Sequence, residues 1–398
     1  MKRFTLKFAL LLAILSSVLT CLVTVGVGFF VLRSTAPPAD IAGSIREYSE
    51  MLGMIDEVYI GDFDIGIVGN AAMSAAVAAL EDPWSYYISP EEYEDFLNSS
   101  KNRFAGIGVG VAYDEETGGV RILYVYEGSS ADVAGIVAND IIISVDGKDI
   151  HGIGVDGLRD LLARPIGETA ELTVLKDDGK TNVITVKFDF VFINPVRFSM
   201  IGEDIGYVSL ANFDEGLADR FISAVENLID EGAKAFIFDV RSNNGGRVSE
   251  MTRILDFLLP EGEIFITVDK DQKEDVILSD ENMVDLPAIV LVDRHSYSAA
   301  EYFAATLREY GYAEIVGDHT TGKNRMQITL RLTSGGALHI SSSQYLTKNR
   351  VSLFDTGGLE PDYTIVLSDE EYALFISGNL EYDSDPQLQM AVSLLSGH

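Results

Sequence analysis

The stretch AFIFDVRSNNGGRVSEMTRILDFLL, residues 235–259, contains a strand, a turn and a helix in that order. Residues 235–240 form a short, almost wholly apolar run, which predicts a buried strand, and residues 250–259 have the pattern of a helix. The turn between them, residues 239–246, is polar and ends in two glycines. Such a turn at the carboxyl end of a strand is where α/β folds place their sites, although an ordinary connecting loop has the same composition.

The alternation of strand and helix continues on both sides of this stretch. Strands are predicted at 205–210 and 288–292, helices at 217–230 and 299–310, and further β structure at 326–345. This order is typical of a layered α/β domain, which we place at residues 191–398.

The region before this domain has a different pattern. Short segments rich in Val and Ile, separated by turn signals such as Asp146-Gly147, predict a small β domain with two helices at residues 101–190. Residues 39–100 are predicted to be helical, and Ser89, Pro90 and Glu92 form a helix start with a capping box. The predicted β strands are 105–113, 120–126, 140–145, 171–176 and 183–188.

The N-terminus has the features of a membrane anchor. Residues 8–32 carry no charge, and 25 helical residues at ~1.5 Å each are long enough to cross a bilayer. Basic residues precede this run, so the positive-inside rule puts the N-terminus in the cytoplasm and the rest of the chain outside. Residues 1–38 are therefore expected to be a cytoplasmic N-terminus, a single transmembrane helix and a linker. A cleaved signal peptide is the main rival, and a lipid anchor on Cys21 is disfavoured because apolar chain follows it.

Composition excludes several classes of function. The formal net charge is −33, so the chain is a poor partner for nucleic acid, which binds clustered Lys and Arg. The single cysteine excludes an intrachain disulfide and a cysteine–histidine zinc site. We expect no metal and no organic cofactor.

Ser298 is a candidate nucleophile. It lies where the strand 288–292 leads into the helix 299–310, and a helix N-terminus favours developing negative charge. The N–H of Ala299 could then bind an oxyanion, as could the N–H groups of Gly245 and Gly246. The alternative is that Ser296 or Ser298 only caps the helix.

A serine nucleophile needs a base, and the five histidines lie in no recognisable triad setting. There is also no G-x-S-x-G elbow. A lysine can act as the base if burial lowers its pKa, and Lys323 follows a polar, glycine-containing stretch just before a predicted strand. The alternative is a solvated surface lysine.

The glycines at 106, 108 and 110 form a third candidate site. Their spacing is wrong for a dinucleotide loop and no helix follows them. A loop whose N–H groups receive a peptide terminus is one interpretation, and a bulged, tightly packed strand is the other.

Several blocks of the chain, in order, resemble the carboxy-terminal processing proteases, also called tail-specific proteases. The resemblance covers about residues 45–365. The blocks are 82–92, the PDZ-like stretches 106–111 and 128–147, the glycine loop 239–246, the serine block 292–301, the lysine block 317–327 and the closing motif 357–362.

The resemblance implies roles for individual residues. It places the nucleophile at Ser298, the general base at Lys323 and a supporting amide at Gln327. The implied oxyanion donors are Gly245, with Gly246 next to it, and Ala299. The implied PDZ carboxylate loop is Gly106, Ile107 and Gly108. The chain departs from the family pattern at Asn244, Ala300 and Asn324, none of which removes a catalytic group.

The expected function is that of a membrane-anchored extracytoplasmic serine endopeptidase, acting on proteins whose C-terminal ends a PDZ domain presents. The expected partners are peptides with free C-termini, the membrane and a possible second copy of the chain, but not nucleic acid. A non-catalytic PDZ peptide-binding protein on the same fold is the alternative. A hydrolase that uses His295 is a third reading.

Overall fold

The computed structural model describes residues 39–396. The predicted anchor, residues 1–38, lies outside the described residues. Within residues 39–396 no helix combines the length and apolar character needed to cross a membrane. The chain divides into two compact units at residues 71 and 72. The described part of the first unit consists of α2 (Ala39–Val58) and the beginning of α3 (Ile65–Ala78), which confirms the helices predicted there.

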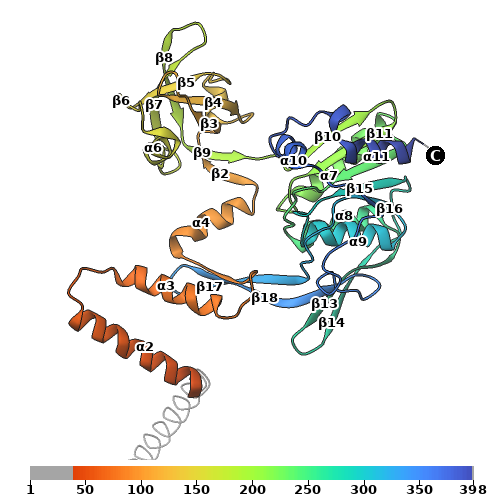
Figure 1. Ribbon diagram of the computed structural model, residues 1–398, viewed down its shortest axis with the longest axis horizontal. Coiled ribbons are helices and arrows are strands. Elements are labelled where there is room, and N and C mark those ends of the chain that lie inside the picture. Colours follow the sequence, from red (N-terminus) through yellow and green to blue (C-terminus); the bar gives the residue numbers. More distant parts are fainter. Residues whose placement is uncertain (1–38, 397–398) are drawn as a thin grey trace, which may run out of the picture. The chain divides into compact units, whose positions relative to one another are not determined.

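The β domain of the second unit is a six-stranded antiparallel sheet in the order β3-β4-β5-β7-β8, with β6 on β5 (Figure 1). Its strands are β3 (Val109–Tyr113), β4 (Val120–Val125), β5 (Ile141–Val145), β6 (Lys148–Asp149), β7 (Thr169–Leu175) and β8 (Thr181–Lys187). Two short helices, α5 (Ser130–Val133) and α6 (Gly154–Leu161), occur where the sequence predicts them. The predicted strand 105–113 is broken in two, because Gly108 has a φ of +87° between β2 (Arg103–Gly106) and β3. β2 pairs instead with β9 (Asp189–Phe192).

The α/β core is a six-stranded sheet in the order β10-β11-β12-β15-β16-β19. Every neighbouring pair is parallel except β10 with β11. The strands are β10 (Val196–Ile201), β11 (Ile205–Leu210), β12 (Ala235–Asp239), β15 (Ala288–Val292), β16 (Ala313–Gly317) and β19 (Tyr363–Thr364). The strands predicted around 205, 235 and 288 are therefore confirmed.

Helices cover both faces of this sheet (Figure 1). In β12, Phe236 and Phe238 pack with α7 (Leu217–Asp230), α8 (Val248–Leu258) and α9 (Ala299–Glu309). The residue between them, Ile237, packs on the opposite face with α11 (Pro386–Leu395). A strand buried on both faces reads as one apolar run, which explains the pattern at 235–240.

A second, antiparallel sheet has the order β1-β18-β13-β14, with β17 also paired to β18. Its strands are β1 (Tyr86–Ile88), β13 (Gly262–Asp269), β14 (Glu274–Ser279), β17 (Arg325–Arg331) and β18 (Ala337–Leu346). The β hairpin predicted at 326–345 is present, whereas β1 lies in a region predicted to be helical. β1 is followed by α4 (Pro90–Ser99), whose Ser89–Glu92 capping box is as predicted. The C-terminal region also contains α10 (Asp369–Ile376) and the short 3-10 helix η1 (Tyr382–Ser384).

Candidate active site

A pocket of about 690 Å³ contains most of the predicted catalytic residues. Ser298, Ala299, Lys323 and Gln327 line it, together with Gly246 of the glycine loop. These residues come from the start of α9, the loop before β17 and the loop after β12. The fold therefore gathers into one pocket blocks that are far apart in the sequence.

Ser298 stands at the N-terminus of α9 in a strained conformation. Its φ is 59° and its ψ is −124°, a region that non-glycine residues rarely adopt. Its side chain makes no capping hydrogen bond to the helix. The hydroxyl of Ser296 is buried, donates to the carbonyl of Val240 at 2.7 Å and accepts the N–H of Asp293 at 3.0 Å. Ser296 thus supports the loop, whereas Ser298 faces the pocket.

The glycine loop packs directly against this serine. Gly245 has a φ of +88°, and a Cβ there would lie 2.8 Å from both the Ala299 nitrogen and the Ser298 Cβ. The N–H of Gly245 donates to Asn243 Oδ1 at 2.8 Å, so in this structure it is engaged within the loop. By contrast, the N–H groups of Ala299 and Gly246 have no protein acceptor in the described part of the chain. Of the two glycines considered for the oxyanion, this geometry favours Gly246.

Lys323 is buried, with 8% of its surface exposed. Burial lowers the pKa of its amine to about 8, although the negative charge of Asp82 opposes this change. Its backbone N–H donates to Glu301 Oε2 at 3.0 Å, and its carbonyl accepts the hydroxyl of Tyr345. A lysine with this pKa is neutral often enough near neutral pH to accept a proton.

The amine of Lys323 lies against aromatic rings. It lies 4.4 Å from the ring centre of Trp84 and 5.8 Å from that of Tyr297. Between residues 39 and 396, no hydrogen bond joins it to Ser298. The amide of Gln327 donates to the Arg325 carbonyl at 2.9 Å and to Ser341 Oγ at 3.0 Å, and not to Lys323. The three predicted residues share the pocket, but the contacts between them are not made in this conformation.

Three residues of this site were missed by sequence reasoning. Glu301 is fully buried and binds the backbone of the lysine loop, Tyr345 binds the Lys323 carbonyl, and Trp84 covers the lysine amine. Trp84 and Glu301 lie in the blocks 82–92 and 292–301 that carry the family resemblance, but neither was given a role, and Tyr345 lies in none of these blocks.

His295 is not placed for catalysis. It is exposed, its ring stacks on Tyr372 at 5.5 Å, and it does not line the pocket. The pocket does contain His339, whose pKa is lowered by burial and by the charge of Lys323. Among residues 39–396, no three His, Cys, Asp or Glu side chains are grouped to hold a metal ion.

Of the predicted carboxylate loop, Gly106 is the last residue of β2 and pairs with Asp189 of β9, whereas Ile107 and Gly108 connect β2 to β3. The side chain of Ile107 is buried in the β-domain core, and its carbonyl accepts the N–H of Ala131 at 2.9 Å. A Cβ at Gly108 would lie 2.2 Å from the Cβ of Ser129, so only glycine fits this position. Helix α6 packs against β3, and the loop comes directly before this strand.

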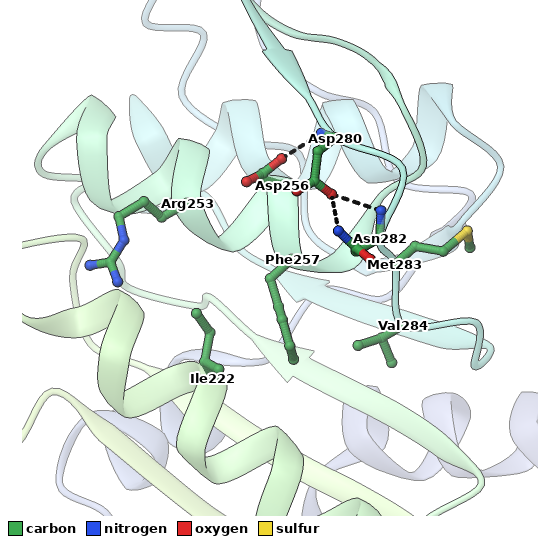
Figure 2. A pocket seen from close by; sticks show the side chains of 8 residues that line it. All are labelled: Ile222, Arg253, Asp256, Phe257, Asp280, Asn282, Met283 and Val284. Carbon is green, nitrogen blue, oxygen red and sulfur yellow. Dashed lines mark hydrogen bonds between the residues drawn. The ribbon is translucent and has the colours of Figure 1, made fainter.

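A hollow of about 340 Å³ lies elsewhere, between α7, α8 and residues 280–284 (Figure 2). Its polar groups are paired with one another or with nearby residues. The N–H of Asp280 donates to Asp256, the Asp280 carboxylate accepts from Asn282, and Arg253 pairs with Asp219 at 2.5 Å. None of the predicted site residues lines this hollow, and we assign it no chemistry.

Known protein families match both the α/β core and the β domain. The model of peptidase family S41 matches residues 204–365, and a PDZ domain model matches residues 121–176. A carboxyl-terminal-processing protease of Picosynechococcus is 29% identical over 331 residues, which cover 82% of this chain and 78% of the relative. Residues 204–365 thus match peptidase family S41, and most of the chain is similar to carboxyl-terminal-processing proteases.

Two other proteins resemble the chain over most of its length. The carboxy-terminal processing protease CtpA of Bacillus subtilis strain 168 is 27% identical over 389 residues, which cover 96% of this chain and 82% of the relative. The crystal structure of an S41 protease from Bacteroides fragilis NCTC 9343 has a TM-score of 0.56 and 20% identity, covering 85% of this chain and 91% of the other. The expected combination of a mixed α/β protease fold with a PDZ domain is confirmed. Residues 82–85 lie outside both matched segments, although Trp84 lines the pocket.

Proposed function

We propose that this protein is a membrane-anchored, extracytoplasmic serine endopeptidase that works with a Ser298–Lys323 dyad. The observation that carries the proposal is the sharing of one pocket by a strained serine and a buried lysine. Ser298 has a φ of 59° at a helix N-terminus, and burial lowers the pKa of Lys323 to about 8. Their arrangement gives a nucleophile and a base without a histidine.

In this mechanism, Ser298 Oγ attacks the carbonyl carbon of the scissile bond while its proton passes to the neutral amine of Lys323. The C–N bond then breaks, and the Lys323 ammonium donates this proton to the leaving amine. Water, deprotonated by Lys323 in turn, hydrolyses the acyl-enzyme. The N–H groups of Ala299 and the glycine loop stabilise the oxyanion, at about 3 kcal/mol for one donor.

Two side chains must move before this reaction. The Lys323 amine leaves the face of Trp84 for the hydroxyl of Ser298, and the Gln327 amide leaves Ser341 to support the lysine. We therefore interpret the described conformation as a resting state.

In this proposal, the PDZ domain binds the substrate, and the N-terminal segment anchors the enzyme to the membrane. The PDZ domain captures the C-terminal carboxylate of a protein substrate through the N–H groups of Gly106, Ile107 and Gly108. The uncharged run at 8–32 supports a single membrane span with the catalytic part outside the cytoplasm. Exposed apolar residues on α2, including Ile41, Ile45 and Met54, support pairing with a second copy of the chain.

Cleavage of a peptide with a free C-terminus tests the proposal against a protein that only binds peptides. The full chain in detergent should yield two products by mass spectrometry, and the Ser298→Ala variant should bind the peptide but yield none. Binding without cleavage by the unmodified chain would establish the non-catalytic alternative. Extraction of cell membranes at alkaline pH should leave the full chain in the membrane fraction, and release from it would contradict the anchor.

A further inference from the structure

A short turn from the N-terminal part of the chain is fixed onto the catalytic core. In the 82–85 turn, the N–H of Ser85 donates to the carbonyl of Asp82 at 3.1 Å, and its hydroxyl donates to the Asp82 carboxylate at 2.5 Å. The core holds this turn from two strands. Arg325 of β17 pairs with Asp82 at 3.0 Å, and the N–H of Ser341 in β18 donates to Ser85 Oγ at 3.0 Å.

The turn holds its tryptophan against the proposed base. The N–H of Trp84 donates to Asp82 at 3.3 Å, and the ring lies 4.4 Å from the Lys323 amine. Tyr297 flanks the same amine, with its ring 5.5 Å from that of Trp84. The face of an indole attracts an ammonium ion but has no such attraction for a neutral amine.

Other groups around the lysine contribute to its charge balance. Negative charge comes from Asp82 in the turn and from Glu301 of α9, which binds the Lys323 N–H. Arg325 of β17 offsets Asp82, and the pKa of His339 in β18 is lowered by burial and by the charge of Lys323. The phenols of Tyr297 and Tyr345 are neutral, because burial raises the pKa of each. In the described part of the chain, the amine contacts aromatic faces and forms no ion pair with a carboxylate.

We propose that Trp84 is a positioning residue of the dyad: it retains the protonated side chain of Lys323 and releases it toward Ser298 when the amine becomes neutral. This inference rests on the proposed function of Lys323 as the base. It makes the 82–85 turn part of the catalytic machinery, although the turn lies outside the matched protease and PDZ segments.

The fluorescence of Trp84 gives a test that needs no substrate. Trp84 is the one tryptophan of the sequence, so the emission of the full chain in detergent reports this contact directly. Titration from pH 6 to 10 should change the emission with a midpoint near 8, the pKa of Lys323. The change should persist in Ser298→Ala and be absent in Lys323→Met. An equal change of emission with pH in Lys323→Met would overturn the proposal.

The pH profile of kcat/KM gives the second test. In Trp84→Leu the apolar cover remains but the attraction for the ammonium is lost, so the midpoint should fall by about 0.5 to 1.5 pH units. In Trp84→Phe, whose ring attracts an ammonium ion less strongly than an indole does, the midpoint should fall less than in Trp84→Leu. Tyr113→Leu removes an exposed ring of β3, outside this pocket, and its midpoint should not move.

The outcomes separate this inference from the proposed dyad. An unmoved or raised midpoint in Trp84→Leu, with Lys323→Arg inactive, would overturn the role of Trp84 and leave the dyad intact. An active Lys323→Arg variant would overturn the dyad itself, and with it the release of the base by Trp84.

Discussion

The carboxylate of Glu301 accepts the backbone N–H of Lys323 at 3.0 Å, although Glu301 belongs to the helix that Ser298 begins. It also accepts the N–H of Gly322 at 2.6 Å and the hydroxyl of Thr320. Burial raises the pKa of Glu301, and these hydrogen bonds oppose that change. One buried side chain thus fixes the loop of the proposed base relative to the nucleophile.

Glu301→Gln should impair catalysis more than folding. An amide replaces one of two acceptor oxygens with a donor, so an N–H of the lysine loop loses its partner. We expect kcat/KM to fall roughly tenfold to a hundredfold, the equivalent of one mispaired buried group. Glu309→Gln is a matched control, since Glu309 lies in the same helix and accepts from Thr347 and Asn349 away from the pocket. Equal losses of kcat/KM in both variants would contradict the role of Glu301.

The sequence predicted the core strands because each carries its own signal. Residues 235–240 are all buried, and the apolar run can be recognised without knowing which helices cover the two faces of the sheet. The 82–85 turn carries no such signal, since its place depends on Ser341, 256 residues along the chain from Ser85. The same limit applies to the site. The motif predicted roles for Ser298, Lys323 and Gln327, but the hydrogen bond of Gln327 to Ser341 depends on tertiary contacts that no local pattern contains.

Activity should rise with pH through the titration of Lys323. The base works only when neutral, and its pKa is lowered to about 8, so kcat/KM should increase between about pH 7 and 9 and then level off. Lys323→Ala and Lys323→Arg should be inactive, because a guanidinium keeps its proton throughout this range. His295→Ala should keep the same profile. Initial rates on one peptide across pH test this, and a folded but inactive His295→Ala enzyme would contradict the assignment.

The two serines of the nucleophile block should respond in opposite ways. Ser298→Ala should lose all cleavage with little change in melting temperature, since its hydroxyl caps no helix. Ser296→Ala should still cleave, but removal of its buried hydroxyl leaves the N–H of Asp293 without an acceptor and the carbonyl of Val240 with the N–H of Asn243 alone, which costs about 1–3 kcal/mol of unfolding free energy. Calorimetry and peptide cleavage on both variants check this. A stable, inactive Ser296→Ala would reverse the assignment.

The C-terminal helices should stabilise the core through a buried ion pair. Arg241, in the loop after β12, donates to Asp385 at 2.8 Å and to Gln387 at 2.9 Å, and the side chains of the ion pair are almost fully buried. Asp385→Ala leaves part of this charge unpaired and removes the N-cap of α11, so the free energy of unfolding should fall by about 3–5 kcal/mol. Asp383→Ala, exposed two residues earlier, should change it by less than about 0.5 kcal/mol. Guanidinium unfolding measures both, and similar values would contradict this prediction.

Amidation of a substrate's C-terminus should weaken its capture by the PDZ domain. The predicted loop offers the N–H groups of Gly106, Ile107 and Gly108, and hydrogen bonds to a carboxylate are worth about 1.5–3 kcal/mol. KM should therefore rise roughly tenfold to a hundredfold for the amide, while kcat changes little, because the C-terminus is bound away from the reacting carbonyl. High salt should reduce the difference, since it screens the carboxylate. A peptide too short to reach the PDZ domain is the control, and its acid and amide forms should be cleaved alike. Equal KM values for the long acid and amide peptides would show that this loop does not bind a carboxylate.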